Sequence, residues 1–299
     1  MFEAQKDQEI FEISGVTVGG RLGEIPTVLI GTIFYHGHKI VEDEKKGVFD
    51  RRKAEELINH QEELSEKTGN PCMVDVVGAS TEALRKYLDF VSSSTDAPIL
   101  MDGVTASNNI FGLEYARKSG LVNRLIYNSL TPEYKQTEIE KIKEVGLESA
   151  VLLALNNKDF SAIGRITVID DLLGVTSPAG IRKPLIDTCV LDLATLGQAC
   201  WALSKLKEKY GLPVGCGPHN AVDTWKRLKT KYGKRAVEPC AASASVVAAA
   251  SGANFILYGP IEAADYVFPA VGMVDAAYGQ VMMEKGRKLE RTHPRFRIG

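Results

Sequence analysis

PILMDG at 98–103 and RLIYNS at 124–129 are short apolar segments that each end in polar side chains. KPLIDT at 183–188 and GLPVGCGPHN at 211–220 follow the same plan. In a parallel barrel, the carboxyl ends of all strands meet at one mouth, where active sites are built. We therefore expect the polar residues that close these segments to lie together, namely Asp102, Asn128, Asp187 and Asn220.

The rest of the chain alternates between strand-like and helix-like segments, which predicts a (β/α)8 TIM barrel, with an open doubly wound sheet as the main competitor. The length of 299 residues suits one such domain, over 1–299. The expected strands are 27–34, 72–78, 98–103, 124–129, 149–156, 212–217 and 253–260, together with a sixth strand that shares 184–193 with the loop after it. The expected helices are 53–69, 81–94, 109–120, 137–146, 195–211, 225–233, 239–252 and 263–289.

Two segments depart from this alternation. FEISGVTV at 11–18 alternates in polarity and GGRLGE follows it with turn residues, which predicts a short N-terminal hairpin that caps the bottom of the barrel. Residues 156–182 show no clear periodicity, and we expect a long loop there with at most one helical turn. Loops of this length in a compact domain are usually functional.

Composition limits the class of protein. The formal net charge of −2 gives no sign of a nucleic-acid-binding surface, which needs a basic patch or stripe. No apolar stretch approaches the roughly 18 residues needed to span a membrane, and the charged start is unlike a signal peptide, so we expect a cytoplasmic protein. The five cysteines have no C-x-x-C spacing, which argues against a disulfide framework or structural zinc. The small and apolar residues of 263–289 are compatible with a homodimer.

Polar residues at the strand ends are the candidates for a binding site. Burying an acid in an apolar strand costs several kcal/mol unless it is hydrogen-bonded or paired. A flat ligand with N–H donors, such as a pterin, could supply those bonds, whereas capping of a helix N-terminus or a turn is the structural alternative. Besides the four residues named above, the candidates are Asp75, Asn156 and His219.

The loop after the seventh expected strand contains Gly215 and Gly217. This G-x-G is a weak phosphate signal because the longer glycine pattern is incomplete and the loop lacks Lys and Arg. The glycines could instead give a bulky cofactor room to approach the backbone. His36 and His38 could bind a metal only with a third ligand such as His219, and we expect no metal.

These residues resemble a known family. TVLIGTIFYHGHKIVEDEKKGVFDR at 27–51, together with RLIYNS, KPLIDT and GLPVGCGPHNA, is similar to the H subunit of tetrahydromethanopterin S-methyltransferase and to its soluble bacterial relatives that methylate tetrahydrofolate. The resemblance extends over nearly the whole chain and implies a barrel of the pterin-binding type. It implies that Asp102, Asn128 and Asp187 hold the pterin ring and that Asn220 lies near N5 of the pterin, with Asp75 acting through an ordered water.

The resemblance also implies the chemistry. A methyl group would pass in line from a methylated corrinoid (methyl-Co(III)) protein to N5 of a tetrahydropterin, with Asn220 and Asp102 as the catalytic residues. The corrinoid would belong to a partner protein, because this chain has no Asp-x-His-x-x-Gly stretch for a cobalt-ligating histidine. We expect a soluble enzyme that uses tetrahydrofolate as methyl acceptor. The alternatives are the H subunit of the membrane-associated complex that uses tetrahydromethanopterin, a barrel enzyme for a phosphorylated substrate, and a non-catalytic scaffold.

Overall fold

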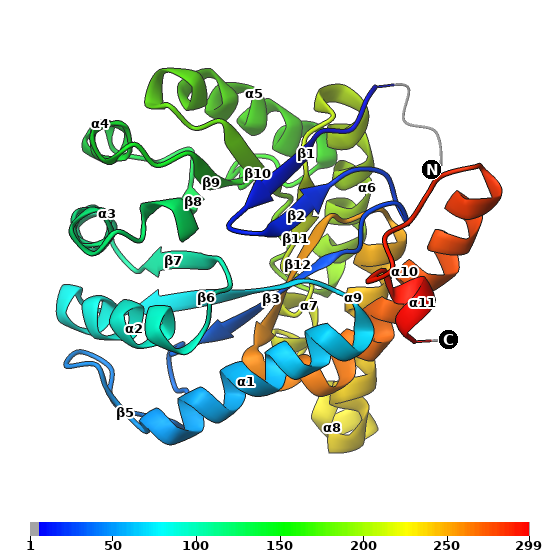
Figure 1. Ribbon diagram of the computed structural model, residues 1–299, viewed down its shortest axis with the longest axis horizontal. Helices are drawn as coiled ribbons and strands as arrows, with labels where there is room; N and C mark the ends of the chain where they lie inside the picture. The colour runs from blue at the N-terminus through cyan, green and yellow to red at the C-terminus, as the bar shows by residue number, and fades with distance from the viewer. Residues whose placement is uncertain (1–5, 299) are drawn as a thin grey trace.

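A closed barrel of eight parallel strands forms the centre of the protein, as seen in the computed structural model, which describes residues 6–298 (Figure 1). The last strand of the barrel pairs with the first, so the sheet has no free edge. The predicted (β/α)8 barrel is therefore confirmed. The prediction that the start of the chain is unlike a signal peptide concerns residues that include 1–5, which lie outside the described residues. The barrel strands are β3 (Val28–Ile33), β6 (Cys72–Gly78), β7 (Ile99–Gly103), β8 (Leu125–Leu130), β9 (Ser149–Leu153), β10 (Lys183–Asp187), β11 (Val214–Cys216) and β12 (Phe255–Pro260).

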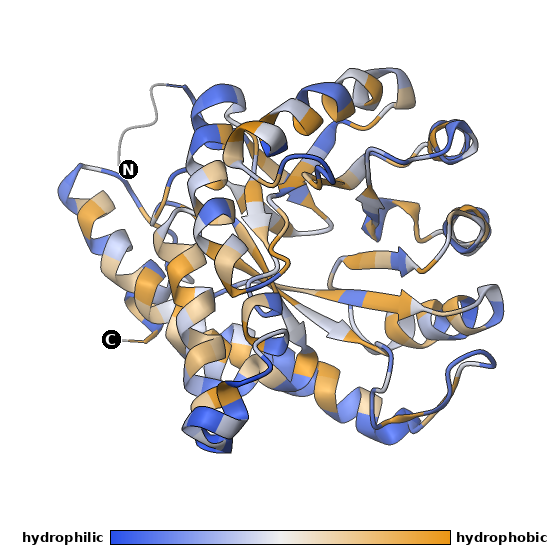
Figure 2. Cartoon of the chain, turned by 180° about the vertical axis from the view of Figure 1, so that it is seen from behind, coloured by the Kyte–Doolittle hydropathy of each residue, from blue (hydrophilic) through white to orange (hydrophobic). Residues whose placement is uncertain are grey.

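Helices surround the barrel and turn their hydrophobic sides toward the strands (Figure 2). Their ends follow local capping chemistry: Ser80 accepts a hydrogen bond from the backbone of Ala83 at the start of α2, and Gly69 ends α1 with φ of 81°. The main helices are α1 (Arg51–Thr68), α2 (Thr81–Ser94), α3 (Ala106–Ser119), α4 (Gln136–Val145), α5 (Ala162–Ala179), α6 (Leu193–Tyr210), α9 (Val237–Ala250) and α10 (Ala264–Glu284). Shorter elements are α7 (Asn220–Asp223), α8 (Leu228–Tyr232), α11 (Pro294–Arg297) and the antiparallel strand pair β4 (Val41–Asp43) and β5 (Val48–Phe49).

The predicted long loop at 156–182 is wrong, because α5 occupies most of it. Ser161 caps the start of this helix by accepting a hydrogen bond from the backbone of Gly164, and Gly180 ends it with φ of 83°. Glycine, β-branched residues and an internal Pro178 lower the intrinsic helix propensity of the segment. Its apolar side chains pack into the main core, so tertiary burial stabilises a helix that local sequence does not favour.

The lower end of the barrel is filled by the N-terminal hairpin of β1 (Ile10–Ile13) and β2 (Val16–Gly19). Ile13 and Val18 are fully buried against inward-facing residues of the barrel strands, which confirms the predicted cap. The hairpin turn itself lies at Ser14 (φ 45°) and Gly15 (φ 83°), a pair of positive φ values typical of a type I′ turn, and not at 19–24 as expected. The hairpin thus closes one end of the barrel with apolar side chains.

Buried polar contacts also join distant parts of the chain around Thr27, just before β3. Asp275 of α10 is 1% exposed and accepts hydrogen bonds from the Thr27 backbone (2.8 Å), the Thr27 hydroxyl (3.0 Å) and the Asn70 amide (2.6 Å). These contacts fix the closing helix against the beginnings of β3 and β6.

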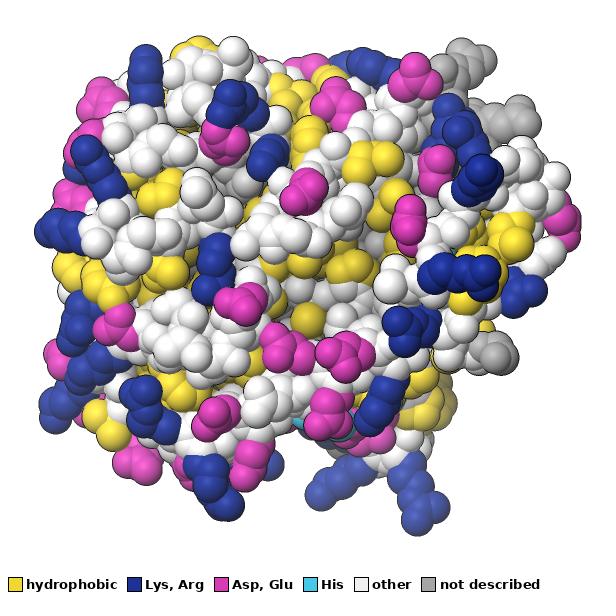
Figure 3. All heavy atoms as spheres, viewed as in Figure 1, with side chains coloured by type: hydrophobic (Ala, Val, Ile, Leu, Met, Phe, Trp, Pro, Cys, Tyr) yellow, Lys and Arg dark blue, Asp and Glu magenta, His cyan; other side chains and the backbone are white. Residues whose placement is uncertain are grey.

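The outer surface is of mixed charge. Basic and acidic side chains are interspersed over the face shown in Figure 3. No helix within residues 6–298 combines the length and the apolar character needed to cross a membrane.

Candidate functional site

Four of the predicted site residues lie at the open end of the barrel, one step above its apolar interior. Met73, Leu100, Ile126 and Leu185 belong to the interior cluster that contacts the hairpin. Residues two positions further along a strand point to the same face. That spacing brings together Asp75, Asp102, Asn128 and Asp187, each two residues after one of these apolar side chains.

Asp75 is at the centre of a hydrogen-bonded row across three strands. Its carboxylate accepts hydrogen bonds from the Thr32 hydroxyl of β3 (2.9 Å) and from the Asn128 amide of β8 (3.0 Å). Burial raises the pKa of Asp75, although both hydrogen bonds act in the opposite direction. The contact fixes the Asn128 side chain with its amide nitrogen toward Asp75, so that Asp75 supports Asn128 within the mouth.

Asp102 lies near the end of β7 and is less buried than Asp75. Burial and, secondarily, the negative charge of Asp75 raise the pKa of Asp102 well above its usual range. Two carboxyl groups that repel each other in a buried setting hold a proton more readily than either would alone. The mouth therefore contains a carboxyl pair able to retain a proton near neutral pH.

Asp187 ends β10 and has a different environment. Its carboxylate accepts a hydrogen bond of 2.7 Å from the backbone of Cys189, and the residue is 9% exposed. Burial raises the pKa of Asp187 to about 6, while the Cys189 bond and the positive charge of Arg165 act to lower it. At neutral pH this arrangement favours an ionised carboxylate that is held in one orientation.

Asn220 begins α7, directly after the β11 loop, and its amide donates a hydrogen bond to the Val190 carbonyl (3.0 Å). It therefore lies on the Asp187 side of the mouth. Gly215 has a packing role, because a Cβ there would be 2.2 Å from the Phe255 carbonyl oxygen on β12. The atoms nearest to a Cβ on Gly217 would belong to the side chains of His219, at 3.4 Å, and Asn220, at 3.6 Å, which are ordinary contact distances, so this position retains some room.

The histidines do not form a metal site. His38 accepts a hydrogen bond from the Phe34 backbone (3.0 Å) and contacts Glu262 (3.1 Å), whereas exposed His36 pairs with Glu44. The His219 ring contacts the Leu257 carbonyl oxygen (3.0 Å). No group of three metal-binding side chains occurs in the part of the chain that the structure describes.

Asn156 has a structural role, as in the alternative that the polar residues at strand ends cap a helix or a turn. Its side-chain oxygen accepts hydrogen bonds from the backbones of Lys158 (3.0 Å) and Asp159 (3.1 Å), and its amide donates to the Gly164 carbonyl (3.1 Å). The side chain therefore organises the turn that leads into α5, and its hydrogen-bonding capacity is largely used within the protein.

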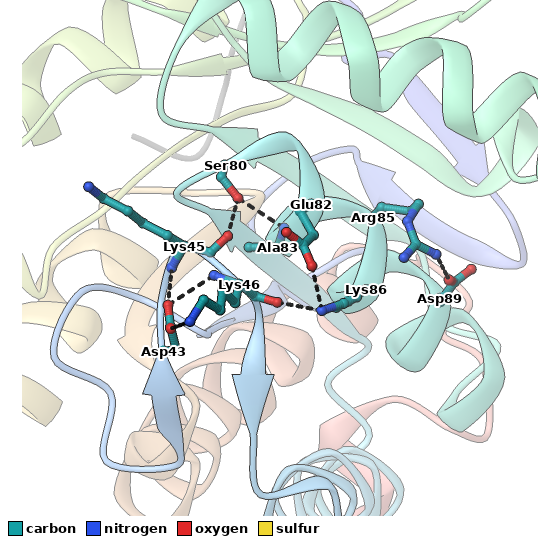
Figure 4. Close-up of polar contacts among 9 residues, drawn as sticks. All are labelled: Asp43, Lys45, Lys46, Ser80, Glu82, Ala83, Arg85, Lys86 and Asp89. Carbon is teal, nitrogen blue, oxygen red and sulfur yellow. Dashed lines mark hydrogen bonds and ion pairs between the residues drawn. The ribbon is translucent and has the colours of Figure 1, made fainter.

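A second feature of the mouth is the pair of strands β4 and β5, which lies in the connection after β3. Ser80, the N-cap of α2, and Lys86 of α2 donate hydrogen bonds to the carbonyls of Lys45 and Lys46, and the Lys86 bond is 2.6 Å long (Figure 4). The motif at 27–51 thus folds into the first barrel strand and a rim that is fixed to the second helix.

Sequence reasoning missed Arg165, because it lies in the segment expected to be a loop. The side chain is 1% exposed and donates hydrogen bonds to the carbonyls of Thr188 and Cys189 beside Asp187. A lone arginine among apolar residues near the start of a capped helix is a detectable signal only once α5 is recognised as a helix.

Comparison with known proteins shows which family the chain is similar to. The family model described as "Tetrahydromethanopterin S-methyltransferase MtrH subunit" matches residues 6–290. The chain belongs to this family. The H subunit of tetrahydromethanopterin S-methyltransferase from Methanothermobacter marburgensis is 40% identical over the full length of both chains. The same subunit from Methanopyrus kandleri is 41% identical over 91% of each chain, and the H subunit of the putative methyltransferase mtx from Methanosarcina barkeri is 37% identical over 98% of each.

These relatives correct one prediction. Tetrahydrofolate was expected as the pterin, with tetrahydromethanopterin as the alternative. The preference for tetrahydrofolate is wrong, because relatives that match along the whole chain are named for tetrahydromethanopterin. The prediction that the chain belongs to this methyltransferase family is confirmed.

Solved structures confirm the fold. Yersinia pestis dihydropteroate synthase superposes with a TM-score of 0.63 at 16% identity, covering 91% of this chain and 100% of that chain. The Vibrio fischeri enzyme gives a TM-score of 0.62 at 14% identity, covering 91% and 99%. The barrel is therefore of the same type as that of dihydropteroate synthase.

Proposed function

We propose that this chain binds a tetrahydromethanopterin-type pterin in the barrel mouth and exchanges a methyl group between N5 of that pterin and a corrinoid carried by a partner protein. The observation that carries the proposal is the convergence of Asp102, Asn128 and Asp187 above the apolar interior. The relatives' names, which specify a tetrahydromethanopterin methyltransferase, supply the substrate class.

The side chains of the mouth complement the edge of a pterin. The 2-amino group and N3–H of the ring are donors, and an ionised Asp187 can accept from both. Asn128 can use its free carbonyl oxygen, because its amide nitrogen is already bonded to Asp75. Hydrogen bonds to charged groups contribute about 1.5–3 kcal/mol each, so this set can fix both the position and the rotation of the ring.

The thiols near the mouth are poor nucleophiles. Burial, followed by the negative charge of Asp187, raises the pKa of Cys189 to about 12, and burial raises the pKa of Cys216 as well. Since the thiolate is the reactive form, neither cysteine is suited to carry the methyl group at neutral pH. Direct transfer between N5 and the corrinoid then remains, and its catalysis rests on positioning, which can contribute roughly 7–11 kcal/mol at best.

Methyl transfer also changes the protonation of N5. When the methyl group leaves N5, the electron pair of the broken bond stays on N5 and takes up a proton; in the reverse direction N5 loses that proton. Among the mouth residues, the pair of Asp75 and Asp102 is suited to hold it, because the pKa values of both are raised. The corrinoid supplies the cobalt that accepts or donates the methyl group, and this chain supplies the orientation of N5.

Calorimetric titration with tetrahydromethanopterin, and in parallel with tetrahydrofolate, tests the proposed substrate. We expect tight binding of tetrahydromethanopterin and weaker binding of tetrahydrofolate. Methyl exchange between the bound pterin and free methylcobalamin then separates an enzyme from an inert scaffold. Binding of neither pterin would refute the proposed site, and binding without methyl exchange would favour the scaffold.

Replacing Asn220 with alanine is expected to slow methyl transfer by about tenfold to a hundredfold, with little change in pterin affinity, because a polar group beside N5 acts on charge that changes during transfer. The measurement is the single-turnover rate together with the dissociation constant. Asn157→Ala is the matched control, because Asn157 is an exposed rim residue bonded to Glu133. Equal losses in rate and affinity would make Asn220 a ring contact only.

A further inference from the structure

Arg165 is among the most deeply buried large side chains in the protein, and it lies beside the mouth. It is 1% exposed, in the first turns of α5. Its Nε donates a hydrogen bond to the Thr188 carbonyl (2.7 Å), and its Nη2 donates to the Cys189 carbonyl (3.1 Å). Both carbonyls belong to the turn that follows Asp187, so one side chain of α5 holds the backbone after β10.

We propose that Arg165 is a positioning residue that fixes the Thr188–Cys189 turn and thereby presents the Asp187 carboxylate to the pterin ring. This inference rests on the proposed function and extends it to a residue that touches neither pterin nor corrinoid. The link is direct: Arg165 holds the Cys189 carbonyl, and the Cys189 backbone N–H holds the Asp187 carboxylate at 2.7 Å.

The turn needs such support because its conformation is unfavourable by itself. Cys189 has φ of 59°, in the left-handed region. That region is unfavourable for a residue other than glycine and persists only when the surroundings enforce it. Arginine suits the task, since its planar guanidinium offers donors in a fixed fork that can bond two successive carbonyls together.

The charge of Arg165 has a second consequence for Asp187. Its remaining nitrogen, Nη1, is buried and has no hydrogen-bond partner among the described residues. A buried cation of this kind is incompletely compensated and favours a negative charge nearby. The titratable groups that act on Asp187 and Arg165 are the thiols of Cys189 and Cys216, which stay neutral because their pKa values are raised, and Asp159. Arg165 is therefore the cation that counters the burial of Asp187.

The test compares Arg165→Met and Arg165→Lys with Arg124→Met. Arg124 is a matched control, because it also donates to backbone carbonyls, those of Ser92, Thr95 and Ala97, but it precedes β8 at the opposite end of the barrel. The dissociation constant for tetrahydromethanopterin is measured by calorimetry from about pH 5 to about pH 8, a range that brackets a carboxyl group whose pKa is raised above the usual value for aspartate. The melting temperature of each variant is recorded as a measure of folding.

For Arg165→Met we expect affinity to fall about tenfold, the loss of one well-oriented charged hydrogen bond. We also expect the pH below which binding is lost to move upward, because Asp187 without its cation takes up a proton more readily. Arg165→Lys keeps the charge but not the fork, so it should restore the pH midpoint and only part of the affinity. Arg124→Met should change neither. A purely structural role would lower the melting temperature without moving the pH midpoint, and that result would overturn the inference.

A second measurement does not depend on the pterin. Carboxyl NMR of protein labelled with 13C-aspartate reports the titration of Asp187 directly, with Asp187→Asn used to assign the signal. We expect the pKa of Asp187 to rise in Arg165→Met and to stay near the wild-type value in Arg165→Lys. An unchanged titration in a folded Arg165→Met variant would refute the inference. Failure of the wild-type protein to bind pterin would instead refute the proposed function.

Discussion

Replacing Asp187 with alanine is expected to weaken pterin binding by about a hundredfold. The carboxylate can accept two hydrogen bonds from the ring, and each bond to a charged acceptor contributes about 1.5–3 kcal/mol. A loss of roughly 3 kcal/mol corresponds to about two factors of ten in the dissociation constant. Asp187 is already ordered by the Cys189 backbone before any ligand arrives, so little of its binding energy is spent on orienting it.

The measurement is calorimetric titration above pH 7, where Asp187 is ionised because its pKa is about 6. Asp192→Ala is the matched control: it removes an aspartate from the connection between Asp187 and α6, where Asp192 caps α6 by accepting a hydrogen bond from the backbone of Thr195. The control should retain wild-type affinity. Unchanged affinity in Asp187→Ala itself would remove Asp187 from the pterin site.

Replacing Asp275 with alanine is expected to lower the free energy of unfolding by about 3 kcal/mol. The carboxylate is 1% exposed and satisfies the Thr27 backbone, the Thr27 hydroxyl and the Asn70 amide. Removing a buried acceptor leaves its donors unsatisfied, at about 1–3 kcal/mol for each that finds no substitute. The Asn70 amide retains the Thr27 carbonyl as a partner (3.0 Å). We therefore expect the loss of stability to lie near the lower end of the range obtained by adding the costs of the three donors.

Chemical denaturation provides the measurement. Asp265→Ala is the control on the same helix, because Asp265 is exposed and pairs with a partly exposed His60. An exposed pair of this kind contributes about 0–1 kcal/mol. A loss for Asp275→Ala no larger than that of the control would mean that water replaces the carboxylate and that the closing helix is held by apolar packing alone.

The fold was largely predictable because strand and helix periods alternate clearly along the chain. The segments 72–78 and 81–94 were predicted with the bounds that β6 and α2 have. The segment 156–182 was not, since α5 owes its stability to burial rather than to propensity and contains Pro178. The hairpin turn was also misplaced: Ser14 and Gly15 form it, although GGRLGE has the stronger turn composition.

The candidate site was predictable where strand ends alone determine it. Asp75, Asp102, Asn128 and Asp187 share one face because they occupy equivalent positions on their strands. The sequence could not show how their environments differ, since Asp102 is influenced by Asp75 whereas Asp187 is influenced by Arg165. Such differences depend on contacts between residues that are far apart in the chain.

The hairpin that fills the lower end of the barrel has a kinetic consequence. With Ile13 and Val18 packed into the interior, the hairpin closes the lower end of the barrel, opposite the end where Asp102, Asn128 and Asp187 lie. Under the proposed function, the pterin enters and the corrinoid protein docks at that same end of the barrel. The corrinoid protein is the larger of the two and covers the mouth when it docks. We therefore expect an ordered binding sequence. The pterin enters before the partner protein docks and leaves after the partner has dissociated, and the docked partner separates the site from solvent while the methyl group is transferred.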